Sequence, residues 1–267
     1  MRGVGVTALV AEVVPEAAVP VLVVLTGLGD PAFLTALVVI VYVFGPRYHL
    51  LGRRAGATVV AITFLALSAT VFLKYGFAMA RPPPEIMLIA EDGAGFPSGH
   101  ATGAAATYVG LAAYLDRWSR STRYRLAGFL VVLVALTRVL LGVHYLVDVV
   151  AGTFVGLLAV VAVRWVSRDG LTKAFAMAIP LAVGGTLLAV TVENALVAGL
   201  VSGATLGWWL AAERDIDVTA STGKQVAGLV VGAILVAVGY ESGIPVVAGL
   251  AGAGSGSLFL AAPGLDP

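Results

Sequence analysis

The chain has 267 residues, of which 60% are hydrophobic and only 12% are charged, and its net charge is +1. A typical soluble protein is about 25% charged, and it cannot hide this much apolar surface because more than half of any globular surface is already apolar. The composition therefore excludes a soluble enzyme, a disordered chain and a nucleic-acid-binding protein with a basic face. The absence of cysteine excludes disulfides, thiol nucleophiles and cysteine-ligated metals. The mean hydropathy of +1.00 predicts an all-α, polytopic transmembrane bundle with about eight to ten helices, at about 20 residues per span.

Apolar runs follow one another along the whole chain and mark the expected helices. They lie near 17–45, 56–79, 99–115, 126–143, 145–165, 174–192, 195–212, 225–239 and 243–262. Residues 29–31, Gly-Asp-Pro, break the first run, which therefore forms either two spans or an interfacial helix followed by one span. Residues 3–16 carry Glu12 and Glu16 and are either an amphipathic lead-in or part of the first span.

Basic residues are concentrated in alternate connections. Segments 46–54, 116–125 and 164–173 hold most of the arginines and are separated from one another by pairs of spans. They are therefore expected on one face of the bilayer, which the positive-inside rule makes the cytoplasmic face of the cell membrane. The connections between them, 80–98 and 137–145, are then expected on the extracytoplasmic side.

The first cluster of candidate functional residues is Lys74, followed after six residues by Arg81 and Pro82. Seven residues make about two helical turns, so the spacing predicts that both cations project from one side of one helix. The prolines 82–84 then end that helix. The alternative is snorkelling, in which both side chains only reach for the interface. Lys74 argues against it, because it is one of three lysines and lies inside an apolar run.

The second cluster is Pro97-Ser98-Gly99-His100, at the start of an apolar run. Serine is a favoured N-cap, so Ser98 is expected to begin a helix. The backbone amides of Gly99 and His100 would then lie at the positive end of the helix dipole, where an anion binds. The alternative is an ordinary cap next to a histidine whose hydrogen bonds are satisfied.

The third cluster is Thr137-Arg138, followed by His144 and Asp148. The last two are four residues apart, which predicts a shared helical face. A carboxylate held against one imidazole nitrogen fixes the tautomer and leaves the other nitrogen free to attack. The alternative is a simple helical pair worth a few tenths of a kcal/mol. Asp148 leads into an apolar run, however, and burying an acid there without a functional role would cost about 2.5–3.5 kcal/mol.

All three clusters fall on the expected outward side. Together they supply three cations, a helix N-terminus with a hydroxyl, two histidines and one carboxylate. Converging cations and backbone amides suit a phosphoryl group, whose charge is spread over its equatorial oxygens. Two histidines at different places allow one to attack phosphorus and the other to protonate the leaving oxygen.

These segments resemble the signature of the phosphatidic acid phosphatase type 2 family, the membrane relatives of vanadium haloperoxidases and bacterial acid phosphatases. That signature is Lys, six residues, Arg-Pro; then Pro-Ser-Gly-His; then Ser-Arg, five residues, His, three residues, Asp. Every spacing is present here, and the one departure is Thr137 in place of serine, which keeps a hydroxyl. The resemblance covers roughly residues 56–165, and 174–267 lie outside it.

The resemblance implies a role for each motif residue. His144 would be the nucleophile that forms a phosphohistidine, Asp148 would hold and polarise it, and His100 would act as general acid and then as general base. The phosphate oxygens would be bound by Lys74, Arg81, Ser98, the Gly99 amide and Arg138. Members of the family need no metal or other cofactor. This agrees with the outward connections, whose acids Glu85, Glu91 and Asp92 form no ligand cluster.

The resemblance thus implies an integral-membrane phosphatase for lipid phosphates or isoprenyl diphosphates, with residues 1–168 as the catalytic domain. This domain would be a six-helix core, and residues 169–267 would be a transmembrane extension whose role stays open, as does the oligomeric state. The apolar part of the connection 83–96 is expected to rest on the headgroup region. One alternative is a phosphotransferase that uses an alcohol acceptor. Another is a transporter or scaffold that keeps the anion site without turnover.

Overall fold

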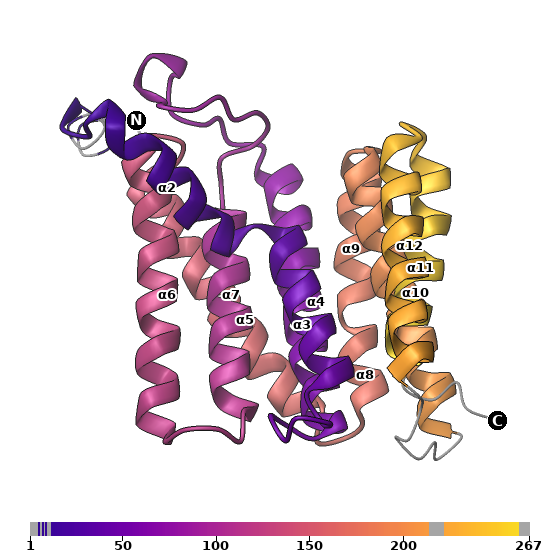
Figure 1. The fold of residues 1–267 in the computed structure, drawn as a ribbon. Coiled ribbons are helices and arrows are strands. Elements are labelled where there is room, and N and C mark those ends of the chain that lie inside the picture. The colour runs from indigo at the N-terminus through magenta and orange to yellow at the C-terminus, as the bar shows by residue number, and fades with distance from the viewer. Residues whose placement is uncertain (1–4, 6, 8, 10–11, 214–221, 262–267) are drawn as a thin grey trace.

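The computed structural model describes residues 5, 7, 9, 12–213 and 222–261. In this part of the chain all regular elements are helical, and most run side by side along one direction (Figure 1). The predicted all-α polytopic bundle is confirmed. The elements are η1 (Glu16–Ala18), α2 (Val19–Thr26), η2 (Gly27–Gly29), α3 (Pro31–Phe44), α4 (Arg53–Phe77), η3 (Pro84–Ile86), α5 (Gly99–Tyr114), α6 (Arg120–Leu140), α7 (Leu146–Val166), α8 (Leu171–Ala176), α9 (Ala178–Leu188), α10 (Val192–Glu213), α11 (Thr222–Glu241) and α12 (Pro245–Ala261).

The first apolar run forms a bent pair of helices. Segments Glu16–Gly29 and Pro31–Phe44 meet at an angle of 48° and pass the length and composition test for a span only together. Asp30 makes the break, because its carboxylate caps α3 by accepting from the amides of Ala32 (2.8 Å) and Phe33 (3.2 Å). The expectation for residues 3–16 falls largely outside the described residues.

Five helical segments are long and apolar enough to cross a membrane, or up to six if the bent pair counts as one span. The five are Arg53–Phe77, Leu146–Val166, Leu171–Leu188, Val192–Ala211 and Gly223–Glu241. Helix α4 is the most enclosed of them, with 78% of its apolar window buried. It packs against α3, α5, α7 and α9 and forms the centre of the main hydrophobic core.

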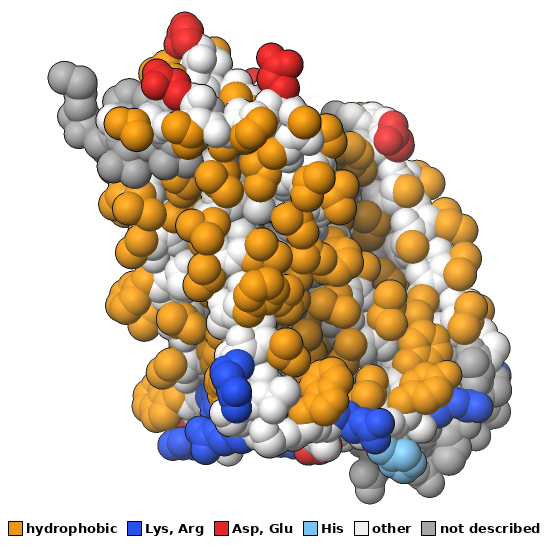
Figure 2. Space-filling view, turned by 60° about the vertical axis from the view of Figure 1, so that its left-hand side comes forward, with side chains coloured by type: hydrophobic (Ala, Val, Ile, Leu, Met, Phe, Trp, Pro, Cys, Tyr) orange, Lys and Arg blue, Asp and Glu red, His pale blue; other side chains and the backbone are white. Residues whose placement is uncertain are grey.

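The three basic connections lie at one end of the bundle, as the sequence predicts. The amide of Asp116 donates to the carbonyl of Leu50 (2.8 Å), and Arg54 donates to the carbonyl of Ser167 (3.2 Å). Figure 2 shows Lys and Arg side chains gathered at this end, acidic side chains at the other, and a broad hydrophobic band between them. Charges at both ends of an apolar band are typical of a membrane-spanning bundle.

The helices after α7 form a second group, which packs on the first mainly through α9. The predicted run 174–192 contains the end of α8 and all of α9, which meet at Met177. Helix α9 packs on α4, and α10 lies between α9 and α12. Close contact is possible because glycines face backbone: a Cβ on Gly199 or Gly203 would collide with backbone atoms of α12.

Candidate active site

Lys74 and Arg81 do not project from one helix, so that prediction is wrong. Helix α4 ends at Phe77, and Ala78 adopts a left-handed conformation (φ 45°) while its amide donates to the carbonyl of Lys74 (2.9 Å). The physical reason is the run of prolines from Pro82, which cannot continue a helix and restricts the residue before each of them. Lys74 therefore lies in the last turn of α4, and Arg81 lies in the connection that follows.

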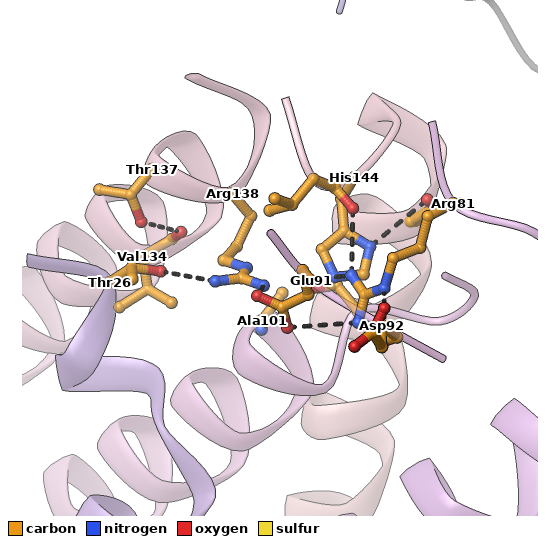
Figure 3. A network of polar contacts seen from close by, with 12 residues as sticks. Thr26, Arg81, Glu91, Asp92, Ala101, Val134, Thr137, Arg138 and His144 are labelled. Carbon is orange, nitrogen blue, oxygen red and sulfur yellow. Dashed lines mark hydrogen bonds and ion pairs between the residues drawn. The ribbon is translucent and has the colours of Figure 1, made fainter. Parts of the chain in front are cut away.

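Arg81 ties this connection to the turn before α7. Its Nη1 atom donates to the carbonyl of Val143 (3.1 Å) and lies 3.2 Å from Nε2 of His144. Its Nε atom donates to the carbonyl of Asp92 (2.9 Å), and its Nη2 atom pairs with Glu91 (3.2 Å). Figure 3 shows these contacts converging on one guanidinium group, so Arg81 is held directly beside the candidate nucleophile.

The N-terminus of α5 is built as the sequence predicts. Ser98 is fully buried, is the N-cap, and accepts from the amide of Ala101 (3.4 Å). Its own amide donates to the carbonyl of Asp148 (3.0 Å), which joins α5 to α7. A Cβ on Gly99 would lie 3.9 Å from Cε of Lys74, so that lysine reaches the first turn of α5.

Arg138 occupies the last turn of α6 and is only 1% exposed. Its Nη2 atom pairs with Glu91 (2.8 Å), and its Nη1 atom donates to the hydroxyl of Thr26 at the end of α2 (3.3 Å) (Figure 3). The hydroxyl of Thr137 donates back to the carbonyl of Val134 (2.7 Å), within its own helix. The threonine that departs from the signature therefore has a local partner.

His144 and Asp148 meet, although not on one helical face as predicted. Helix α7 begins at Leu146, so His144 precedes it. Asp148, in the first turn, accepts from the amide of Tyr145 (3.0 Å), and this cap sets where the helix begins. The Nδ1 atom of His144 lies 3.5 Å from Oδ2 of Asp148, and both side chains are buried. The carboxylate thus faces one ring nitrogen while Nε2 faces Arg81.

The electrostatic environment keeps His144 neutral. Burial lowers its pKa well below the ordinary value of 6.5, and the positive charges of Arg138, Arg81 and Lys74 lower it further, in that order. Glu91 opposes this shift but does not cancel it. All three predicted cations therefore act on one imidazole and favour its neutral form.

His100 is the second residue of α5 and borders the same group. It interacts electrostatically with Arg138, Glu91 and His144. The bend after α2 closes this side of the site, since a Cβ on Gly29 would lie 3.1 Å from the Cβ of His100. The structure therefore brings together every residue predicted for the site.

Two further residues of the site were missed from the sequence. Glu91 pairs with both Arg81 and Arg138, and Thr26 contacts Arg138 from outside the motifs. Burial by itself would raise the pKa of Glu91, but the charges of Arg138 and Arg81 outweigh it and hold the pKa below its usual range. The sequence signal for Glu91 is its place in the connection that carries Arg81, and Glu85 and Asp92 share it, so this signal alone does not single out Glu91.

The assembled groups are suited to an anion. Three cations and a helix N-terminus converge beside a neutral imidazole, which is an arrangement that stabilises negative charge in a site shielded from water. Within the residues that the structure describes, no group of three or more His, Cys, Asp or Glu side chains could hold a metal ion.

Comparison with known proteins agrees with this geometry. Residues 55–171 match the family model of the PAP2 superfamily, and this range contains every motif residue of the site. Residues 55–171 are therefore a PAP2-like segment of the chain. Phosphatidylglycerophosphatase B of Bacillus subtilis (strain 168) is 39% identical over 77 residues, which are 27% of this chain and 38% of that protein.

A solved structure also matches. The crystal structure of the first transmembrane PAP2-type phosphatidylglycerolphosphate phosphatase from Bacillus subtilis superposes with a TM-score of 0.56 and 26% identity. The match covers 62% of this chain and 84% of that one. Together with the apolar helices, this likeness indicates that the chain is a membrane protein.

Proposed function

We propose that this protein is an integral-membrane phosphatase that hydrolyses lipid phosphates or isoprenyl diphosphates through a phosphohistidine. The observation that carries the proposal is the meeting of Arg81 and Asp148 on opposite sides of one buried imidazole, that of His144. The ring is oriented on one side and presented to an anion site on the other. Binding an anion would need the cations alone, and an oriented imidazole adds a nucleophile.

Substrate phosphate binds where the positive groups converge. Arg81, Arg138 and Lys74 neutralise its oxygens, and the α5 N-terminus, with Ser98 and the Gly99 amide, completes the cradle. Fixed cations supply the charge stabilisation that Mg²⁺ supplies in many phosphoryl-transfer enzymes, so the reaction proceeds without a metal.

The first chemical step forms a phosphorus–nitrogen bond. The Nε2 lone pair of neutral His144 attacks phosphorus, and the bond from phosphorus to the leaving oxygen breaks, with its electron pair staying on that oxygen. His100 donates a proton to the leaving oxygen, which requires the protonated imidazole, and the negative charge of the bound phosphate beside Arg138 favours that form. Asp148 stabilises the positive charge that develops on the ring of His144 through its Nδ1 side.

The second step releases phosphate. His100, now neutral, accepts a proton from water, whose oxygen attacks phosphorus while the bond to His144 breaks. Inorganic phosphate leaves, and both histidines return to their starting protonation states. Splitting the transfer into two steps replaces one difficult displacement by two easier ones.

The substrate class and the placement in the membrane belong to the same proposal. The active site opens on the extracytoplasmic side of the cell membrane, opposite the basic connections near Arg54 and Asp116. Residues 1–168 form the catalytic domain, and 169–267 form a transmembrane extension. Because both relatives are named for phosphatidylglycerol phosphate, we would test that lipid first.

One experiment tests reaction, substrate class and metal independence together. The protein purified in detergent is given phosphatidylglycerol phosphate, phosphatidic acid or an isoprenyl diphosphate, each with EDTA, and phosphate release is measured. We expect release from at least one lipid and none from the His144→Ala variant. Quenching the wild type at high pH with labelled substrate should trap label on the protein as phosphohistidine.

Three other results would reject or change parts of the proposal. Release that disappears with EDTA would reject metal independence, and release by His144→Ala equal to wild type would reject the mechanism. If a lipid alcohol diverts the phosphoryl group from water, the enzyme is a phosphotransferase.

A further inference from the structure

The phosphate site already contains an anion that belongs to the chain itself. One carboxylate oxygen of Glu91 lies 3.2 Å from Nη2 of Arg81, and the other lies 2.8 Å from Nη2 of Arg138. A carboxylate bridging two guanidinium groups makes the contacts that two oxygens of a phosphate would make. Figure 3 shows Glu91 lying between the two arginines.

The two arginines are fixed independently of Glu91. Arg81 is also held by the carbonyl of Val143, and Arg138 also by the hydroxyl of Thr26. Their side chains are 7% and 1% exposed, whereas that of Glu91 is 25% exposed. The carboxylate therefore enters the site from its water-facing side and can leave to water, while the guanidinium groups stay in place.

We propose that Glu91 is an internal competitor for the phosphate-binding position: it occupies the site between Arg81 and Arg138 when no substrate is bound and exchanges with the phosphate. This inference rests on the proposed function, because it takes the two arginines as phosphate ligands. It adds a residue that touches neither phosphorus nor the leaving group and yet sets how strongly phosphate binds and how readily the product leaves.

The connection that carries Glu91 is anchored on both sides of it. On one side, the amide of Leu88 donates to the carbonyl of Leu141 (3.0 Å), and on the other, the amide of Gly95 donates to the carbonyl of Met79 (2.7 Å). Between these anchors, the carbonyl of Asp92 also accepts from Nε of Arg81 (2.9 Å). The exchange therefore requires movement of the Glu91 side chain and not of the whole connection. Within that stretch, Gly93 has a left-handed backbone (φ 78°) and no atom within 4 Å of its Cβ position.

An internal competitor has a calculable effect. The apparent dissociation constant of phosphate is its intrinsic value divided by the fraction of molecules in which the site is open. If Glu91 fills the site about 90% of the time, removing it tightens phosphate binding about tenfold. Product release is favoured for the same reason, since the carboxylate replaces each departing phosphate on the arginines.

The test is the binding of inorganic phosphate to the detergent-solubilised full chain, measured by titration calorimetry without any substrate. We expect the Glu91→Gln variant to bind phosphate at least about tenfold more tightly than wild type. The matched control is Glu85→Gln, which removes an exposed carboxylate from the same connection and should leave the dissociation constant unchanged. Thermal unfolding of each variant verifies that it is folded.

A second variant separates occupation of the site from a change in its electric field. Glu91→Asp keeps the charge but is one methylene shorter, so it cannot bridge both guanidinium groups. Occupation predicts tighter phosphate binding for Glu91→Asp as well, by a smaller factor than for Glu91→Gln. A field effect alone predicts that Glu91→Asp binds as wild type does, and that result would overturn the inference.

The inference and the proposed function can fail separately. Unchanged or weaker phosphate binding by Glu91→Gln, in a protein that hydrolyses lipid phosphate, would overturn only the inference. Tighter binding in both Glu91 variants, in a protein that hydrolyses none of the lipids, would support the internal competitor and reject the phosphatase.

Discussion

The two groups of helices in this chain differ in where their ionisable side chains lie. Around the ends of α4 to α7, the bundle buries Arg138, His144 and Asp148, each at most 1% exposed. In the described parts of α10 to α12, the charged side chains Glu193, Lys224 and Glu241 are exposed. Buried ionisable groups in a membrane are expensive, so their concentration in one group marks where function lies.

The second group relies on contact between backbones. Cβ atoms on Gly199, Gly203 and Gly207, spaced four residues apart on α10, would collide with the backbone of α12. The hydroxyl of Ser257 donates to the carbonyl of Gly203 (3.0 Å) across this contact. Small residues and interhelical hydrogen bonds of this kind hold helices together in lipid. We therefore expect substitutions of the buried ionisable residues in the first group to affect catalysis, and substitutions at the helix contacts of the second group to affect stability.

The first prediction, with the largest expected effect, concerns the candidate nucleophile. We expect His144→Ala to lose at least about four orders of magnitude in lipid phosphate turnover, as removal of the nucleophile does in other covalent mechanisms. We expect Asp148→Asn to lose about three to four orders, because the amide favours the wrong imidazole tautomer. Phosphate release by the purified variants provides the measurement.

A matched control for these two variants is Asp169→Asn, in an exposed connection at the opposite end of the bundle. It should retain wild-type turnover. Full activity of either site variant would contradict the assigned role, and an equal loss in Asp169→Asn would point to a general effect on the protein.

The second prediction concerns the α10–α12 contact. Gly203→Val places a branched side chain against the backbone of Ala253, and overpacking of this kind costs about 1–3 kcal/mol. We expect a lower midpoint of thermal unfolding and unchanged turnover per folded molecule. In Gly128→Val, the same substitution on α6 meets open space, so its midpoint should stay close to wild type. A catalytic defect in folded Gly203→Val would remove the distinction between the two groups.

The sequence predicted the helices well because their signals are local. Composition and apolar runs predicted where the helices lie, and the arginines of alternate connections correctly grouped at one end. The number of spans was less well predicted: five described segments, or up to six with the bent pair, are long and apolar enough to cross a membrane, against about eight to ten expected. The N-cap at Ser98 was also correct, because a capping side chain bonds within its own turn. The motif residues lie together as expected, at helix ends or in the connections next to them.

Helix boundaries and distant partners could not be predicted in the same way. Periodicity placed Arg81 on a helix and His144 on the face of Asp148, whereas the left-handed Ala78 and the cap of α7 exclude both arrangements. The contact from Thr26 to Arg138 joins residues 112 positions apart. No local pattern encodes such a pair, because it depends on how α2 packs against α6.

The third prediction tests this distant contact. Thr26→Val keeps the shape of the side chain but removes the oxygen that accepts from Arg138. We expect KM to rise about fivefold, equivalent to about 1 kcal/mol for a long hydrogen bond to a charged group, with little change in kcat. Thr26→Ser should restore KM. Thr205→Val, which removes a hydroxyl bonded within α10, should behave as wild type, and an equal KM change there would reject the positioning role.

The smallest effect concerns the acid limit of activity. A lowered pKa means that His144 gains a proton only at a pH below its ordinary value of 6.5. The reactive neutral ring therefore predominates at pH 6.5, where an unperturbed histidine would be half protonated. We expect kcat/KM, which reports the free enzyme, to fall by less than about half between pH 7.5 and 6.5. The substrate's own titration must be measured separately and subtracted. An acid limb centred at or above pH 6.5 would mean that the nearby cations and burial do not keep the nucleophile neutral.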